Sequence, residues 1–163
     1  MQKNNKSIVK SICFNALFAS LYLALVFAFG DLSFGFANGL ISFRVAEIII
    51  PLCCFDKRYI PGAILGCFCA NLLGGQILDI IIGTLQTCLT VLVLYFVKPK
   101  PLSLLLGAFI CGVIIGIELY ILGFSSIGYW IVLTTFIGEY FILEVGYLII
   151  KKFYYSLNLD KIF

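Results

Sequence analysis

Histidine is absent from this 163-residue chain, and charged side chains make up only 12% of it. The absence of histidine argues against His-based acid–base catalysis and against most zinc sites. The seven cysteines are odd in number, lie within apolar runs and form no CxxC pair, so we expect small buried hydrophobes rather than disulfides or metal ligands. No G-x-x-x-x-G-K-[ST] loop occurs, so the chain does not hydrolyse ATP by that route. We expect no enzyme activity, no cofactor, no metal and no nucleic-acid partner.

Apolar residues dominate the chain instead. They make up 63% of it, and the mean hydropathy is +1.14, far above that of a soluble domain. The chain divides into six apolar stretches, most of them near the roughly 20 residues that cross a bilayer. We therefore predict an all-α membrane protein, a six-helix bundle forming a single transmembrane domain over residues 1–163. The predicted spans are 8–29, 40–55, 60–77, 79–97, 102–123 and 127–150.

Ten of the eleven basic residues lie at the edges of these stretches, and their positions predict the orientation. Lysine and arginine accumulate in short cytoplasmic loops. They precede the first stretch and follow the second, fourth and sixth, whereas the other three connections contain none. Both termini are therefore predicted to be cytoplasmic. The ten residues are Lys3, Lys6, Lys10, Lys57, Arg58, Lys98, Lys100, Lys151, Lys152 and Lys161.

The eleventh basic residue, Arg44, lies inside the second stretch and points to a site. An arginine at the centre of a membrane helix costs on the order of 2.5 to 3.5 kcal/mol on insertion scales, so it needs a partner or a purpose. Glu47 follows three residues later on the same helical face. The pair is either a structural ion pair that neutralises itself or part of a binding site.

Acidic and amide side chains also occur within the spans, and the carboxylates among them outnumber the one intramembrane cation, Arg44. Beyond Glu47, these residues are Asn71, Asp79, Gln86, Glu118, Glu139 and Glu144. Carboxylates in hydrocarbon take up protons or bind a group that is cationic or rich in N–H donors. We expect Arg44, Glu47, Asn71, Asp79, Glu118 and Glu139 to converge on a pocket in the outer half of the bundle. Glu144 lies deeper and is interpreted as structural or gating.

Aromatic residues near the same depth offer flat faces on which a planar ligand can stack. We name Tyr120, Trp130 and Tyr140 as candidate binding residues, with Tyr129 beside them; membrane-interface anchoring is the competing interpretation. The connection from Gly30 to Gly39 combines glycines with aromatics, which suits a cap over an apolar ligand or a plain surface loop.

Small residues recur every fourth position in two spans, a spacing that lets membrane helices approach closely. The stripe in the third span, Gly62, Gly66, Ala70 and Gly74, is interpreted as packing inside the bundle. For the stripe in the first span, docking onto a separate membrane subunit is at least as good an interpretation. That stripe is Ala16, Ser20 and Ala24.

Several segments resemble the QueT family, the substrate-binding S components of energy-coupling-factor (ECF) transporters for queuosine precursors. They are Leu32-Ser33-Phe34-Gly35, Phe43-Arg44-Val45-Ala46-Glu47, Ile60-Pro61-Gly62 through Gly66-Cys67 to Ala70-Asn71, Asp79 through Gly83 to Leu85, Gly116-Ile117-Glu118 and Gly138-Glu139. The resemblance implies six helices, an outward-facing pocket for a 7-deazaguanine base, and import powered by a transmembrane T subunit and two ATPase subunits. It also implies that Ala16, Ser20 and Ala24 contact the T subunit.

Alternatives remain open beside this resemblance. The base can be 7-cyano-7-deazaguanine, 7-aminomethyl-7-deazaguanine or queuine, and the excess of carboxylates favours the cationic aminomethyl form. The chain can also be an S component for another small vitamin, a solitary proton-coupled carrier, or a small membrane enzyme that uses Asp79, Glu118 and Glu139.

Overall fold

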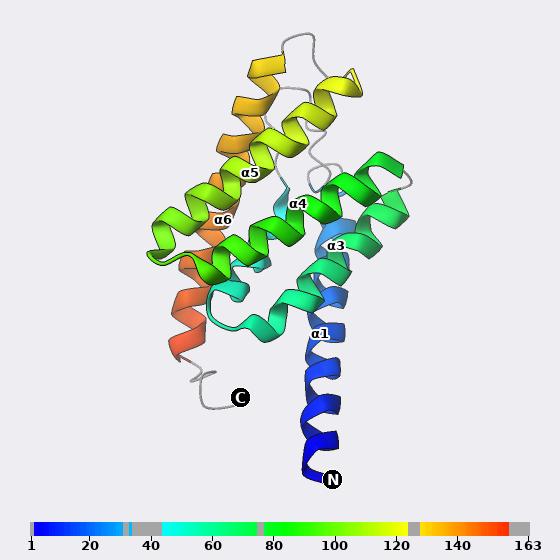
Figure 1. Cartoon of the computed structure of the whole chain (residues 1–163), viewed down its shortest axis with the longest axis vertical. Coiled ribbons are helices and arrows are strands. Elements are labelled where there is room, and N and C mark those ends of the chain that lie inside the picture. The colour runs from blue at the N-terminus through cyan, green and yellow to red at the C-terminus, as the bar shows by residue number, and fades with distance from the viewer. Residues whose placement is uncertain (1, 31–32, 34–43, 75–76, 124–127, 157–163) are drawn as a thin grey trace.

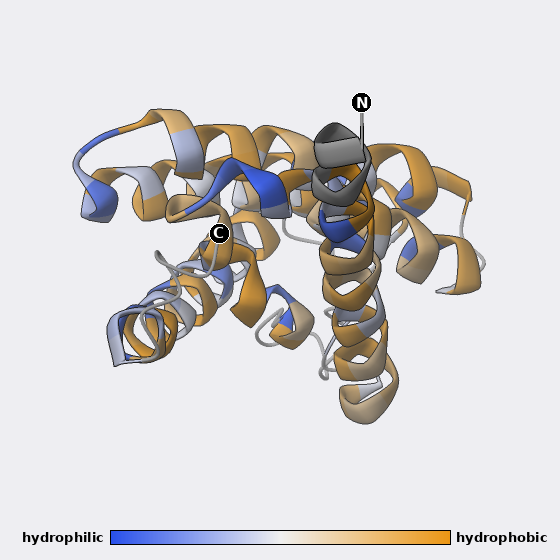
Figure 2. Cartoon of the chain, turned by 90° about the horizontal axis from the view of Figure 1, so that it is seen from below, coloured by the Kyte–Doolittle hydropathy of each residue, from blue (hydrophilic) through white to orange (hydrophobic). Residues whose placement is uncertain are grey.

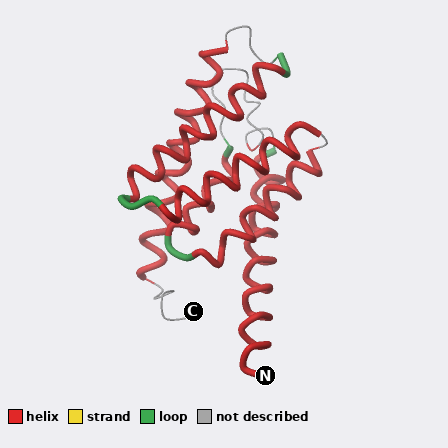
Figure 3. Tube along the Cα trace, in the orientation of Figure 1, coloured by secondary structure: helices red, strands yellow, loops and turns green. Residues whose placement is uncertain are grey.

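Helices account for every regular element in the described part of the chain (Figure 3). The computed structural model describes residues 2–30, 33, 44–74, 77–123 and 128–156. The prediction of an all-α protein is confirmed for these residues. In order, the elements are α1 (Gln2–Phe29), the 3-10 helix η1 (Val45–Cys54), the single-turn 3-10 helix η2 (Lys57–Tyr59), α3 (Ile60–Gly74), α4 (Ile77–Phe96), α5 (Lys100–Ile121) and α6 (Gly128–Ser156).

Four of the described helices are long and apolar enough to cross a membrane. These are α1 from Ile8 onward, α4, α5 and α6, and their bounds lie within a few residues of the predicted spans, except that α6 continues to Ser156. The described residues therefore support four of the six predicted spans by length and composition, and the count of six stays a prediction.

The second and third predicted spans are shorter than expected. The apolar helix predicted over 40–55 is a 3-10 helix over Val45–Cys54, and residues 40–43 lie outside the described part, as does most of the predicted cap segment. Pro51 removes one backbone donor from η1, and three consecutive isoleucines precede it, so this segment favours the α conformation poorly. At about 2.0 Å per residue, η1 spans only about 20 Å. The third predicted span ends at Gly74.

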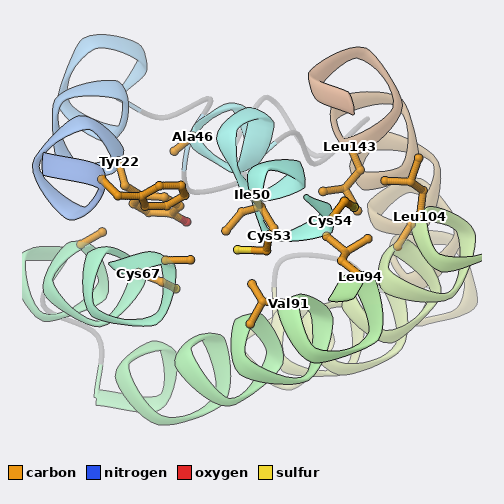
Figure 4. Packing of buried hydrophobic residues seen from close by; sticks show 14 of the residues in the cluster. Tyr22, Ala46, Ile50, Cys53, Cys54, Cys67, Val91, Leu94, Leu104 and Leu143 are labelled. Carbon is orange, nitrogen blue, oxygen red and sulfur yellow. The ribbon is translucent and has the colours of Figure 1, made fainter. Parts of the chain in front are cut away.

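The short helix η1 occupies the centre of the molecule, where it packs against α6, α1 and α4. Its side chains Ile50, Cys53 and Cys54 join the main apolar core with residues from all the long helices (Figure 4). Backbone that is not α-helical is tolerated at membrane depth only where protein surrounds it. The surrounding helices therefore permit the irregular geometry of η1.

The basic edges of the helices lie on the lower and left sides of the molecule in Figure 1. The start of α1 and the end of α6 point toward the lower end, and the α4–α5 turn lies at the left edge near mid-height, whereas α3 and α5 end toward the upper right. Viewed from that lower end, apolar residues cover most of the helices, and strongly hydrophilic positions occur in turns and at isolated sites within the helices (Figure 2). This arrangement agrees with the loop-charge pattern, and the assignment of this end to the cytoplasm stays a prediction.

Glycines allow close helix contacts at several places, among them those of α3 with α1 and of α5 with α6. On α3, a Cβ at Gly62 would lie 2.9 Å from the backbone oxygen of Asn15, and one at Gly66 would lie 2.9 Å from Cβ of Tyr22. The interpretation of this stripe as internal packing is thus confirmed for Gly62 and Gly66, which contact α1. Ala70 is also buried, whereas Gly74 is exposed.

The second close contact joins α5 to α6. A Cβ at Gly116 would lie 2.6 Å from Cα of Val132, where backbone rather than a flexible side chain is in the way. We expect Gly116→Ala to destabilise the protein by about 1–3 kcal/mol, because the helices must separate to accept the methyl group. The thermal unfolding midpoint in detergent measures this effect.

Ile117→Ala provides the control, since Ile117 is exposed away from this contact. Its unfolding midpoint should stay close to that of the wild type. A Gly116→Ala midpoint no lower than that of Ile117→Ala would contradict the close contact.

Candidate functional site

Arg44 is the centre of a buried polar cluster among the helices. It lies at the N-terminal end of η1, is 6% exposed, and directs Nη1 at two acceptors. Nη1 donates to Oε1 of Gln86 over 2.6 Å, and lies 2.8 Å from Oε1 of Glu47. The sequence-predicted ion pair between Arg44 and Glu47 is therefore formed, and Gln86 on α4 completes the environment of the guanidinium.

Gln86 is held in place by its neighbours on α4. Its amide Nε2 donates to Oγ1 of Thr90 over 3.1 Å, and Oγ1 of Thr87 donates to its Oε1 over 3.2 Å. Thr90 in turn donates to the backbone oxygen of Gly107 on α5. All three side chains on α4 are fully buried. This ladder orients the amide oxygen toward Arg44 and connects the site to α5.

Glu139 on α6 brings a second carboxylate to Glu47. Both side chains are fully buried, and the Glu139 carboxyl interacts with Glu47, with Arg44 and with the thiol of Cys111. Neither oxygen of Glu139 accepts a hydrogen bond from the described protein atoms, and Glu47 has only its ion pair with Arg44. Of these two neighbouring carboxylates, Glu47 forms the ion pair with Arg44, and Glu139 lies within its electrostatic range. Both retain acceptor capacity for N–H or O–H donors.

Glu118 and Asp79 carry this acidic character toward the end of the bundle where α5 ends and α4 begins. Glu118 is 3% exposed, and neither of its oxygens has a hydrogen-bond partner in the described residues. It lies within electrostatic range of Asp79 and Arg44. The structure thus brings together four predicted site residues, Arg44, Glu47, Glu118 and Glu139, with Asp79 at the edge.

Asn71 has a different environment from the carboxylates. Its Nδ2 donates to the backbone oxygen of Asp79 over 2.9 Å and to Sγ of Cys67 over 3.4 Å. These bonds join the end of α3 to the start of α4. A role in holding this helical hairpin accounts for Asn71 without a ligand, and its assignment to the binding site stays a prediction.

Three side chains that we did not name as site residues from the sequence also reach the cluster. Tyr22 on α1 is 3% exposed and interacts with Cys67, Glu47 and Arg44, and Figure 4 shows it pointing inward from α1 toward η1 and α3. Cys111 on α5 interacts with Arg44 and Glu139, and Gln86 binds Arg44 directly. Of the three, only Gln86 could be recognised from the sequence, because an amide within a membrane span is unusual. Tyrosine and cysteine are common in apolar cores, so Tyr22 and Cys111 did not stand out.

The aromatic candidates lie farther from the cluster. Tyr120 and Trp130 are 49% and 46% exposed, near the end of α5 and the start of α6, and Tyr129 is 77% exposed. Tyr140 is half-buried and stacks on Phe136 with ring centroids 6.4 Å apart. The described structure does not bring Tyr120 or Trp130 into the buried carboxylate cluster, and their role in binding stays a prediction.

The small-residue stripe of α1 faces outward. Ala16, Ser20 and Ala24 are all exposed, whereas Phe18, Ala19 and Tyr22 on the other side of the helix pack inside. The face is free to contact lipid or another membrane subunit. No three His, Cys, Asp or Glu side chains in the described ranges are grouped in a way that could hold a metal ion.

The balance of charge around Arg44 generates a stability prediction. Arg44→Met leaves Glu47 and Glu139 without a cation, and breaking a buried pair in this way costs about 3–5 kcal/mol. We expect a large drop in the unfolding midpoint for this variant and partial recovery in Arg44→Met/Glu47→Met, which removes both charges. Thermal unfolding of both variants in detergent measures the difference. Equal midpoints would show that Arg44 is not compensating Glu47.

Comparison with known proteins identifies the family. The QueT transporter family model matches residues 12–154, most of the chain, including every residue of the buried cluster. No curated protein and no solved structure matches the chain. The four long apolar helices fit a multi-pass membrane protein with a transport role rather than an enzyme. The chain belongs to the QueT transporter family.

Proposed function

We propose that this protein is the S component of an ECF importer and captures a queuosine precursor, a 7-deazaguanine base, in the cluster around Glu47 and Glu139. The observation that carries the proposal is the pair of fully buried carboxylates, of which only Glu47 is ion-paired with Arg44, and their unfilled acceptor positions. A buried group of this kind needs donors, and family membership points to the class of molecule that supplies them.

A 7-deazaguanine base matches the chemistry of the cluster. The ring N–H and exocyclic amine of a guanine-like edge form two parallel hydrogen bonds to one carboxylate. A second carboxylate can hold an ammonium group, so the aminomethyl base makes better use of Glu118 and Asp79 than the cyano base. In this arrangement the Arg44 guanidinium does not contact the base, and its contacts with Glu47 and Gln86 hold it in position.

The loop-charge pattern gives the proposed orientation of this site in the membrane. With its basic end in the cytoplasm, the protein opens its acidic half toward the outside, where the substrate enters. The exposed face of Ala16, Ser20 and Ala24 is then the contact for the transmembrane T subunit, and two ATPase subunits supply the energy that this chain lacks. Intramembrane carboxylates also suit a solitary proton-coupled carrier, and dependence of uptake on the ATPase subunits distinguishes the two functions.

Glu139→Gln tests the binding site. The amide replaces one acceptor oxygen with a donor, so it opposes an incoming N–H group. We expect the Kd for the preferred 7-deazaguanine base to rise at least about 100-fold, as the loss of charge-assisted hydrogen bonds predicts. Isothermal titration of the detergent-purified protein is the appropriate measurement, since Trp130 is half exposed and its fluorescence need not report on a ligand in the buried cluster.

Glu144→Gln is the matched control. Glu144 lies on the same helix, and one of its oxygens is likewise buried without a partner. The same chemical change there should leave the Kd within about threefold of the wild-type value. Near-normal affinity in Glu139→Gln would remove Glu139 from the site. Saturable binding of an unrelated vitamin instead of any deazaguanine would favour an S component of different specificity.

Ser20→Leu tests the partner face. The larger side chain prevents close approach of another helix, whereas Ser20 itself is exposed and does not line the cluster. We expect unchanged binding of the base in detergent, and uptake into proteoliposomes containing the ECF module to fall at least about tenfold. Leu85→Phe, an enlargement at an exposed position on α4, should leave uptake unchanged. Loss of binding in Ser20→Leu would place this position in the substrate site.

A further inference from the structure

A hollow lies among the basic residues beside the turn from α4 to α5. Its volume is about 430 Å³, and its walls are Cys54, Phe55, Tyr95, Phe96, Lys98 and Lys100. The carboxylate cluster does not reach it, because Lys100 begins α5 whereas Glu118 lies near the other end of that helix. The hollow is therefore separate from the proposed substrate site.

The charge of this hollow has one sign. Two lysines and no carboxylate line it, and the ion pairs in the described residues are Arg44 with Glu47 and Arg58 with Asp56, so no described carboxylate pairs with either lysine. Lys98 is exposed, whereas Lys100 is partly buried and donates from Nζ to the backbone oxygen of Leu94 over 2.7 Å. That bond fixes the ammonium and uses one of its three donors, which leaves two for an anion.

Apart from Cys54, the remaining wall residues are aromatic, and one of them, Phe55, belongs to a stack with α6. Phe55 lies on Tyr147 and Tyr154 with ring centroids 5.6 and 4.7 Å apart, and Lys151 sits 5.8 Å from the Tyr147 ring centre. Phe96 is 72% exposed at the end of a membrane-spanning helix. Aromatic side chains at this level sit between headgroups and hydrocarbon.

We propose that this hollow binds one anionic phospholipid, with the headgroup phosphate on Lys98 and Lys100 and an acyl chain along Phe96 and Phe55. Charge complementarity requires an anion, and the apolar wall at the edge of the membrane selects an anion that carries a hydrocarbon chain. Basic pockets between membrane helices on the cytoplasmic side bind acidic lipid headgroups by this chemistry. The lipid holds the α4–α5 turn at the membrane surface, independently of the substrate that the protein carries.

The test compares lipids of identical acyl chains on the intact, detergent-purified protein by native mass spectrometry. We expect phosphatidylglycerol to bind at least about tenfold more tightly than phosphatidylcholine, and this preference to fall as salt is raised. Lys98→Gln/Lys100→Gln should reduce the preference at least about fivefold. Lys57→Gln/Lys152→Gln removes the same charge from exposed residues at the same end and should retain it.

The single variant Lys98→Gln leaves the bond between Lys100 and Leu94 intact. It therefore tests the lipid preference even if the double variant unfolds. Loss of lipid preference in this variant supports the proposal. Equal binding of phosphatidylcholine, or equal loss in the Lys57 and Lys152 control, overturns it. So does full occupancy by glycerol phosphate at the concentration that saturates the lipid, which would identify a free-phosphate site. The proposal is also overturned if the lysine variants bind lipid as the wild type does but fail to assemble with the ECF module. That result would identify the hollow as a protein-docking site.

Discussion

A single buried guanidinium sets the electrostatic balance on which the centre of this protein depends. Arg44 lies near carboxylates from two elements, Glu47 and Glu139, and among the described residues it is the one cation that forms an ion pair in this cluster. Its position is secured by Gln86, whose amide is in turn held by hydroxyl groups on α4. Since an unpaired charge at this depth is costly, every element that contacts Arg44 must keep its place for the cluster to persist. The same deficit of positive charge makes the cluster receptive to a donor-rich ligand.

The short 3-10 helix is the structural counterpart of this electrostatic centre. Arg44 precedes η1 and Glu47 lies in its first turn, so the segment that carries the ion pair is also the one with irregular backbone. An α-helix of full length through the bundle would satisfy its own hydrogen bonds and occupy more space. Here α1, α4 and α6 enclose η1, and the close approach of Gly146 on α6 to the backbone oxygen of Ile48 shows how tightly they do so. Close packing and site geometry therefore come from the same contacts.

Hydropathy and loop charge were sufficient to locate the four long helices, because lipid imposes a uniform requirement for apolar length. They could not reveal the 3-10 geometry of Val45–Cys54, which depends on the surrounding helices as much as on Pro51. In the site, the charged members were conspicuous because charge is rare in hydrocarbon. Tyr22 and Cys111 were not, since these residue types fill many apolar cores, and only the packing of α1 and α5 brings them to Arg44.

The two faces of α1 connect the proposed partner contact to the cluster. Tyr22 points inward to the residues around Arg44, whereas Ser20 and Ala24 lie on the exposed side of the same turns. A helix is about 10 Å across, so no side chain bridges the two faces directly. Gly62 and Gly66 on α3 lie directly against Asn15 and Tyr22 of α1, so the inner face of α1 is closely packed. Under the proposed docking, a subunit that displaces α1 would carry Tyr22 with it, and Tyr22 lies among the residues around Arg44.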